Sequence, residues 1–349
     1  MTNPGLGGNV TRAPGRTCPH SYRYRPSVFN RPPMHDTETL YVIGGLYGNV
    51  EALSAVLAMK QAEERRGHAV TLCFNGDFNW FNVDAESFVT INESVLAHVA
   101  IQGNVEAELA ENDSTAGCGC AYPSYVSGDF VDRSNRIMER LRAQTPRFPG
   151  LIRKLALLPM HATIGVGGER IGIVHGDPES LAGWAFAVEN MPPGAGRRHR
   201  EPNAAYPITP RERIGDYFHQ AHVRAFCCAH TCLPFAQVFR LHGQDHLVIN
   251  NGAAGMPNFA GTTHGLLTRV SARRDSPDDS LYSIELGALR FDAVPIRYDQ
   301  AAWLRRFETN WPPGSPAHES YFRRITAGPD FDIARAVRTP GARGAGNRF

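Results

Sequence analysis

The stretch from Leu40 to Leu53, LYVIGGLYGNVEAL, constrains the fold more than any other part of the chain. Its first residues form a short apolar run rich in β-forming side chains, which predicts a buried strand. Glycines follow at positions 44, 45 and 48, and apolar residues then recur at helical spacing from Val50 onward. A strand, a tight glycine-bearing loop and a helix in this order are typical of an α/β sheet, in which such loops carry the chemistry.

Composition narrows the class of protein. The length of 349 residues and the hydrophobic content of 42% are sufficient for a sizeable core. A net charge of +2 argues against a nucleic-acid partner. The seven cysteines are an odd number and no apolar leader precedes them, so we expect reduced thiols in the cytoplasm and not a disulfide framework. No run approaches the roughly 18 apolar residues of a membrane span, so we expect no membrane partner.

Four further predicted strands end in short polar motifs. Val70–Phe74 leads into Gly76-Asp77, and a strand predicted over Val95–Ile101 leads into Gly103-Asn104-Val105-Glu106. The strand over Arg170–Val174 ends in His175-Gly176, and Ala225–Cys228 ends in Ala229-His230-Thr231-Cys232. A glycine beside a polar residue at the carboxyl end of a strand indicates a sharp turn that presents the polar side chain.

Together with the first stretch, these motifs resemble, in order and spacing, the five motifs of the calcineurin-like metallophosphoesterases. The first is similar to the branch that reads Asp-x-His-Gly-Asn-x-Glu-Ala-Leu, with Gly48, Asn49 and the run Glu51–Leu53 matching. The resemblance covers roughly Leu40 to Tyr298. It implies a four-layer α/β/β/α sandwich with two facing mixed β-sheets, and metal ligands on loops at one edge.

Carried over residue by residue, the resemblance implies an intact second-metal ligand set and an altered first-metal set. The second-metal residues are Asp77, Asn104, His175 and His230. At the first-metal position Gly45 and Tyr47 replace an aspartate and a histidine, and Cys232 replaces a histidine. We therefore expect one divalent ion per chain, Mn²⁺, Fe²⁺ or Zn²⁺, with Cys232 as a further candidate ligand.

The resemblance also implies a hydrolase that acts on a small, anionic phosphoester, with Tyr47, Asn49 and Glu106 as candidate catalytic residues. Two alternatives stay open. One is a repurposed metalloenzyme with a cysteine-containing site, in which Cys232 works with Tyr47 or with the Cys118/Cys120 loop. The other is a catalytically inactive ligand-binding homologue. Because one ligand set is whole and only the other is replaced, the pattern favours a working one-metal site.

The predicted organisation has three parts. Residues 1–36, rich in Gly, Pro and Arg, read as a poorly ordered or surface-hugging arm, in which Cys18 and His20 form a weak candidate metal pair. Residues 37–300 form the main domain, with a helical cap insertion over about 112–157 and a helix predicted over Ser180–Val188. Residues 301–349 are predicted to form terminal helices and a loose tail.

Overall fold

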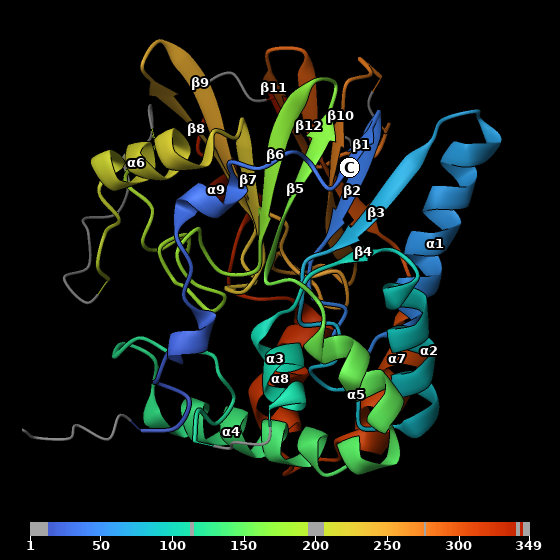
Figure 1. Cartoon of the computed structure of the whole chain (residues 1–349). Coiled ribbons are helices and arrows are strands. Elements are labelled where there is room, and N and C mark those ends of the chain that lie inside the picture. Colours follow the sequence, from blue (N-terminus) through green and yellow to red (C-terminus); the bar gives the residue numbers. More distant parts are fainter. Residues whose placement is uncertain (1–12, 112–114, 195–205, 276, 340–342, 345–349) are drawn as a thin grey trace, which may run out of the picture.

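Two β-sheets form the centre of the molecule, which is described here by a computed structural model covering residues 13–111, 115–194, 206–275, 277–339 and 343–344 (Figure 1). The strands are His35–Thr37 (β1), Thr39–Ile43 (β2), Val70–Phe74 (β3), Val99–Ala100 (β4), His161–Val166 (β5), Glu169–Val174 (β6), Ala225–Cys228 (β7), Phe235–Leu241 (β8), Gln244–Asn250 (β9), Gly265–Ser271 (β10), Tyr282–Leu286 (β11), Leu289–Ile296 (β12) and Arg343–Gly344 (β13). One sheet has the order β1-β5-β6-β7-β9-β8 and the other β13-β11-β12-β10-β2-β3-β4. Both sheets contain parallel and antiparallel pairs, as expected from the sequence.

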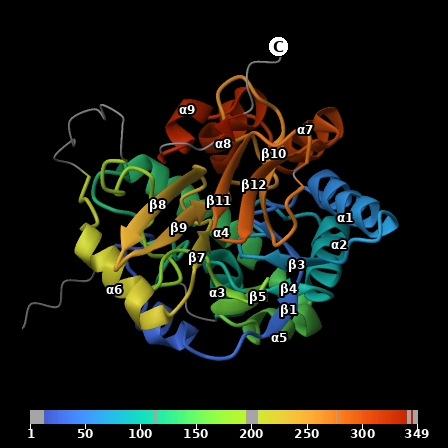
Figure 2. The same ribbon diagram turned by 90° about the horizontal axis from the view of Figure 1, so that it is seen from above.

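Helices cover the outer faces of the sheets and the ends of their strands. They are Val50–Arg65 (α1), Ala85–Leu96 (α2), Asn104–Ala110 (α3), Gly128–Arg142 (α4), Pro149–Ala156 (α5), Arg211–Ala221 (α6), Gln300–Asn310 (α7), Pro316–Ala327 (α8) and Ile333–Ala336 (α9). Seen from above, α6 lies outside the first sheet and α1 and α2 lie outside the second (Figure 2). The expected four-layer α/β/β/α sandwich is confirmed.

The alternation of side chains along the strands builds two cores. On β2, Leu40 and Val42 face the other sheet, whereas Tyr41 and Ile43 face the helices α1 and α2. This period of two is the pattern of a strand that is buried on both faces. Since β2, β3 and β4 run parallel, and so do β6, β7 and β9, their carboxyl ends all open toward the helices in the lower half of Figure 1.

The strand predicted over Val95–Ile101 is wrong in extent. Helix α2 continues to Leu96, the chain turns at Ala97 and His98, and only Val99–Ala100 pairs with β3. The helix begins after Asp84, whose carboxylate accepts a hydrogen bond from the backbone N–H of Ser87. Phe88, Ile91 and Val95 then recur at helical spacing and are fully buried. The local cap and the helical apolar stripe therefore carry the helix into the first two residues of the predicted strand.

The helix predicted over Ser180–Val188 is also wrong, because this segment forms successive turns. The buried carboxylate of Asp177 accepts hydrogen bonds from the backbone N–H groups of Glu179, Ser180 and Ala185, at 2.9–3.0 Å. These bonds satisfy donors that a helix would otherwise pair along its axis. The hydrogen bonds to Asp177 thus hold the segment in turns around its carboxylate.

Within the predicted arm, residues 13–36 lie against the domain, whereas residues 1–12 are outside the described part. Phe29 is completely buried and packs edge-on against Phe226 of β7, at 5.4 Å between ring centroids. Tyr22 donates a 2.6 Å hydrogen bond to the buried carboxylate of Glu108. Of the predicted tail, 343–344 pairs with β11. In the described residues, no helix is long and apolar enough to cross a membrane.

Candidate metal centre

Loops at the carboxyl ends of β3, β4, β6 and β7 carry the polar residues of the site. Asp77 follows β3, Asn104 follows β4, His175 follows β6 and His230 follows β7. The loops approach closely because two glycines lack side chains: a Cβ on Gly103 would lie 2.2 Å from Asp77 Oδ1, and one on Gly76 would lie 2.4 Å from the backbone of Gly103. Gly76 also has φ +93°, a conformation that only glycine adopts readily.

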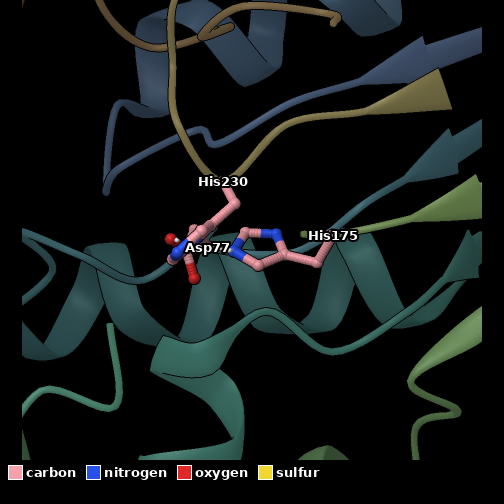
Figure 3. A group of neighbouring side chains, drawn as sticks. All are labelled: Asp77, His175 and His230. Atoms are coloured by element: carbon pink, nitrogen blue, oxygen red, sulfur yellow. Dashed lines mark hydrogen bonds and ion pairs between the residues drawn. The ribbon is translucent and has the colours of Figure 1, made fainter. Parts of the chain in front are cut away.

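Four side-chain atoms converge between these loops. His175 Nε2 lies 3.1 Å from Asn104 Oδ1, 3.2 Å from Asp77 Oδ2 and 3.3 Å from His230 Nδ1. Figure 3 shows Asp77, His175 and His230 pointing toward one common point. Asp77, His175 and Asn104 are almost fully buried, and His230 is 9% exposed. The structure thus brings together all four residues predicted for the second-metal set.

The hydrogen bonds around this point direct four ligand atoms at each other. His175 Nδ1 lies 2.8 Å from the carbonyl of Asn75, so this nitrogen carries a proton and Nε2 is the ring atom directed at the centre. In the same way His230 Nε2 faces the carbonyl of Cys120 at 3.2 Å, which leaves Nδ1 unprotonated. The Asn104 amide donates to the carbonyl of Cys118, and its Oδ1 faces inward. Such a cluster of acceptors requires a cation or a proton.

The pKa values reflect this arrangement. Burial disfavours a charge on His175, but the Asp77 carboxylate raises its pKa above the usual value. Burial and the charge of His175 lower the pKa of His230 to about 3. Although burial opposes ionisation, His175 lowers the pKa of Asp77. At neutral pH, Asp77 is therefore a carboxylate and His230 a neutral imidazole, which are the forms that bind metals.

The residues present fit a divalent metal ion. Ligand atoms placed tetrahedrally at about 2.0–2.1 Å from an ion lie about 3.3 Å from one another, close to the separations found here. In each imidazole, the ring nitrogen that points away from the centre donates its N–H to a backbone carbonyl. This arrangement orients metal-binding histidines in general. In the described part of the chain, this is the one group of three or more His, Cys, Asp or Glu side chains close enough to share an ion.

Two residues predicted to be catalytic, Glu106 and Asn49, hold loops in place and do not line the cavity beside this centre. Glu106 is completely buried and accepts hydrogen bonds from the backbone N–H groups of Asp77 at 2.7 Å and Gly103 at 3.0 Å. Burial and the Asp77 charge raise its pKa to about 7. Asn49 caps α1 by accepting from the N–H of Ala52, and its amide donates to the carbonyl of Gly255. Their catalytic roles stay predictions.

Comparison with known proteins gives a likeness of fold. No protein-family profile and no curated protein matches the sequence. Among solved structures, a hypothetical protein from Pyrococcus horikoshii OT3 matches with a TM-score of 0.53 and 14% identity, over 85% of this chain and 100% of that one. A metallophosphoesterase from Sphaerobacter thermophilus matches with a TM-score of 0.46 and 18% identity, over 83% of this chain and all of that one. The two facing mixed sheets, and the polar motifs that gather at one edge of them, are the arrangement that the sequence resemblance implies. The chain has the calcineurin-like metallophosphoesterase fold.

The position that the sequence resemblance assigns to a first metal holds Gly45, Tyr47 and Cys232. A Cβ on Gly45 would lie 2.3 Å from Cζ of Tyr47, so the tyrosine ring occupies the space of a side chain at position 45. The Tyr47 hydroxyl lies 2.7 Å from Sγ of Cys232, whose thiol also faces the carbonyl of His230 at 3.1 Å. The three replacements therefore form one packed unit.

This unit is neutral at physiological pH. Burial and the nearby Cys232 raise the pKa of Tyr47 well above its usual value. Burial likewise raises the pKa of Cys232, against the opposing charge of Arg324. A protonated thiol is a poor metal ligand. Whether Cys232 binds the ion stays a prediction, and its sulfur lies outside the group formed by Asp77, His175 and His230.

A cavity of about 150 Å³ opens beside the centre of this metallophosphoesterase fold. Asp77, Asn104, His230, Tyr47 and Cys232 contribute to its wall. It also contains residues that sequence reasoning missed, including Trp80, Trp184, Met256, Tyr321 and Arg324. Tyr321 and Arg324 come from α8, outside the stretch that resembles the family, and their spacing of three residues on one helix face is the signal that could have paired them.

The other cysteines predicted as candidates fall in different places. Cys120 lines the cavity, and its sulfur lies 3.5 Å from the amide nitrogen of Asn104. Cys118 is fully buried and places its carbonyl against the same amide. Cys18 lies against Ser180, at 3.2 Å from its hydroxyl, and His20 is exposed. The cap loop therefore reaches the site, and the Cys18/His20 pair does not.

Proposed function

We propose that the protein hydrolyses a small, anionic phosphoester with one divalent metal ion held by Asp77, Asn104, His175 and His230. The observation that carries this proposal is the convergence of four ligand atoms, three of which lie 3.1–3.3 Å from the fourth, His175 Nε2. Each comes from a different loop, so the arrangement is a product of the tertiary fold. A cavity large enough for a small ligand adjoins it.

A divalent ion in this site would supply positive charge to a phosphoryl oxygen and lower the pKa of a bound water molecule. The chain's own residues keep the ligand atoms in place. The backbone N–H of Val105 donates to Asp77 Oδ1 at 3.1 Å, so Oδ2 alone is directed at His175. The carbonyl of Asn75 fixes the ring of His175. These bonds make the site preorganised, since no ligand has to rotate when a substrate arrives.

Tyr47 is the proton donor in this proposal. Its hydroxyl lines the cavity and stays protonated at neutral pH because its pKa is raised by burial and by Cys232. A protonated phenol can hydrogen-bond to the oxygen of a leaving group. The S–H of Cys232 faces the carbonyl of His230, which leaves the Tyr47 O–H free to reorient from the sulfur to a substrate.

Metal content tests the ion site directly. Protein purified without added metal is analysed by elemental mass spectrometry, alongside His175→Ala and His230→Ala. The matched control is His246→Ala, a partly buried histidine on β9 that contacts the carbonyl of Val223. We expect one ion per chain in the wild type and in the control, and a loss of about tenfold or more in affinity for the ion in the two site variants. Equal metal content in all four proteins would overturn the assignment.

Cys232→Ser distinguishes the one-metal centre from a cysteine-containing site. Because the Cys232 thiol is buried and protonated, we expect the serine variant to keep the same ion in the same amount. A change in metal identity or stoichiometry would favour the repurposed metalloenzyme instead. The hydrolase activity is tested separately, by measuring hydrolysis of 4-nitrophenyl phosphate in the presence of the metal identified by mass spectrometry. The hydrolase proposal fails if wild-type turnover does not exceed that of Asp77→Asn.

A further inference from the structure

Arg324 places a guanidinium group beside the altered first-metal position. It lies on α8 and donates a 2.7 Å hydrogen bond from Nη2 to the carbonyl of Cys232. Its Nε atom is buried and has no hydrogen-bond partner among the described residues. The side chain lines the same cavity as Asp77, His230 and Tyr47. A cation therefore lines the space next to the metal ligands, and one of its buried donors is unused.

The charge of Arg324 lies next to the position where a two-metal enzyme would hold its first ion. In two-metal phosphoesterases both ions bind phosphoryl oxygens, so the loss of one ion removes half of the clamp. Here the first-metal position is filled by the neutral Tyr47–Cys232 pair. Arg324 donates to the backbone carbonyl of that same cysteine and, in the part of the chain that the structure describes, is the one arginine or lysine in the cavity wall. A guanidinium group binds phosphate through two parallel N–H donors and stays charged at any relevant pH.

Four aromatic side chains line one continuous part of the cavity wall, which we call the ring wall. They are Trp184, Tyr122, Phe130 and Tyr321. Tyr122 lies 5.8 Å from Trp184 and 5.7 Å from Phe130, and Phe130 lies 5.8 Å from Tyr321, measured between ring centroids. These separations lie within the range of direct aromatic contact. All four are partly exposed, so their apolar faces are accessible to a ligand.

The size of the cavity limits what the ring wall can take. Its volume of about 150 Å³ matches the volume that holds a single benzene molecule in an engineered apolar protein cavity. A phosphoryl group attached to one planar ring, with the ring reaching the open side, suits these dimensions.

On the basis of the proposed function, we infer that the substrate is a phosphate monoester of a single planar ring. Arg324 binds a phosphoryl oxygen on the first-metal side, and the ring wall contacts the organic group. Helix α8 is then part of the substrate site, since it supplies both Arg324 and Tyr321. The positive charge lost with the first metal is replaced by a residue from the C-terminal part of the chain.

Ligand binding tests the role of Arg324 without requiring turnover. The probe is phenylphosphonate, which has no ester bond to hydrolyse, and binding is followed by isothermal calorimetry on protein loaded with its metal. We expect Arg324→Met to raise the dissociation constant about ten- to a hundredfold, the loss typical of a charge-assisted hydrogen bond. Arg324→Lys should recover part of it. Arg323→Met is the matched control, because Arg323 is exposed on the same helix, and it should bind as the wild type does.

Thermal unfolding and metal content of each variant verify that the fold and the ion site are intact. Equal affinity of wild type and Arg324→Met, with both intact, overturns the role of Arg324. If Arg324→Met does not fold, Arg324→Lys and Arg324→Gln decide instead, since both keep a long side chain. The inference also falls if the wild type does not bind phenylphosphonate.

A second comparison tests the ring wall. Methylphosphonate presents the same phosphoryl oxygens without a ring. Phe130→Leu should weaken phenylphosphonate binding about tenfold, by loss of aromatic contact, and leave methylphosphonate binding unchanged. Equal loss for both probes, or tighter binding of a nucleoside monophosphate than of phenylphosphonate, overturns the single-ring substrate.

The outcomes separate this inference from the proposed function. Metal-dependent phosphoester turnover that is unaffected in Arg324→Met would leave the hydrolase standing and reject the inference. Arg324-dependent binding of phenylphosphonate without turnover of any phosphoester would support the binding role of Arg324 and reject the hydrolase. The protein would then be a binding homologue that recognises the same ligand class.

Discussion

The ring of Tyr47 fills the space beside the backbone of Gly45. A Cβ at position 45 would lie 2.3 Å from Cζ, 2.6 Å from Cε1 and 2.7 Å from the hydroxyl oxygen of the tyrosine. Tyr47 itself has φ +55°, an uncommon conformation for a large residue, and its ring is only 3% exposed. The two positions are therefore coupled, since the Tyr47 ring fits only because position 45 carries no side chain.

This coupling predicts a non-additive pair of substitutions. Gly45→Ala forces a methyl group against the Tyr47 ring, so we expect the free energy of unfolding to fall by about 1–3 kcal/mol. In Gly45→Ala/Tyr47→Ala the clash is absent, so the double variant should be more stable than the sum of the two single changes predicts. Urea unfolding of the four proteins measures the coupling.

The control for this cycle is Gly150→Ala, in α5, where an added Cβ meets no atom within 4 Å. Because alanine is the better helix former, this change should leave stability unchanged or raise it by up to about 1 kcal/mol. Additive effects of the substitutions at positions 45 and 47 would show that the ring can move away, and would contradict the coupling.

A buried ion pair stabilises the second sheet. Arg269 of β10 and Asp292 of β12 face each other across the strands, with Nη1 3.0 Å from Oδ2 and both residues at most 1% exposed. Asp292 keeps Arg290, whose Nε lies 2.8 Å from Oδ1, so we expect Arg269→Met to cost about 1–3 kcal/mol, the range for a lost hydrogen bond to a charged group. Arg269→Met/Asp292→Leu should recover part of that loss, because the buried carboxylate is removed as well and Arg290 still pairs with Glu285. Chemical denaturation measures both, and unchanged metal content would verify that the effect is confined to the sheet.

An equal loss in the single and the double variant would contradict this account. It would mean that packing of the aliphatic part of Arg269, and not its charge, supplies the stability. Lys60→Met, which removes an exposed helical ion pair on α1, is the matched control. It should cost at most about 0.5 kcal/mol.

His161 predicts how stability depends on pH. Its ring lies 4.9 Å from that of Tyr24 and 5.1 Å from that of Phe29, where it fixes the arm to β5. Burial and the charge of Arg31 lower its pKa from the usual 6.5. The folded state thus favours the neutral ring, so this contribution is complete above pH 6.5 and is lost as the pH falls through the lowered pKa of the folded state.

His161→Phe keeps an aromatic ring but cannot titrate. We expect the difference in unfolding free energy between pH 7.5 and pH 5 to be smaller in this variant than in the wild type. Equal pH dependence in both proteins would exclude His161 as a source. The same measurements on His20→Phe, which replaces an exposed histidine of the arm, provide the control.

The sequence by itself determined the scaffold. The alternation of apolar residues on β2 and the glycine turns after the strands are local patterns, and they predict the sheet and its active edge without long-range information. The local patterns place Asp77, Asn104, His175 and His230 each at the end of a strand, and the resemblance to the metallophosphoesterase motifs predicted that the four lie together. Local capping hydrogen bonds from Asp84 and Asp177 were harder to foresee, since each competes with the intrinsic propensity of the residues around it.

Tertiary structure alone decided what surrounds those ligands. The pairing of Gly45 with the Tyr47 ring depends on the direction in which a side chain points, and no sequence spacing specifies that direction. The contribution of Tyr321 and Arg324 depends on how α8 packs against α4 and the loop of Cys232, some 90 residues earlier in the chain. Contacts of this kind arise from the burial of apolar faces between distant segments, which is non-directional, and their partners are fixed only once the whole core has formed.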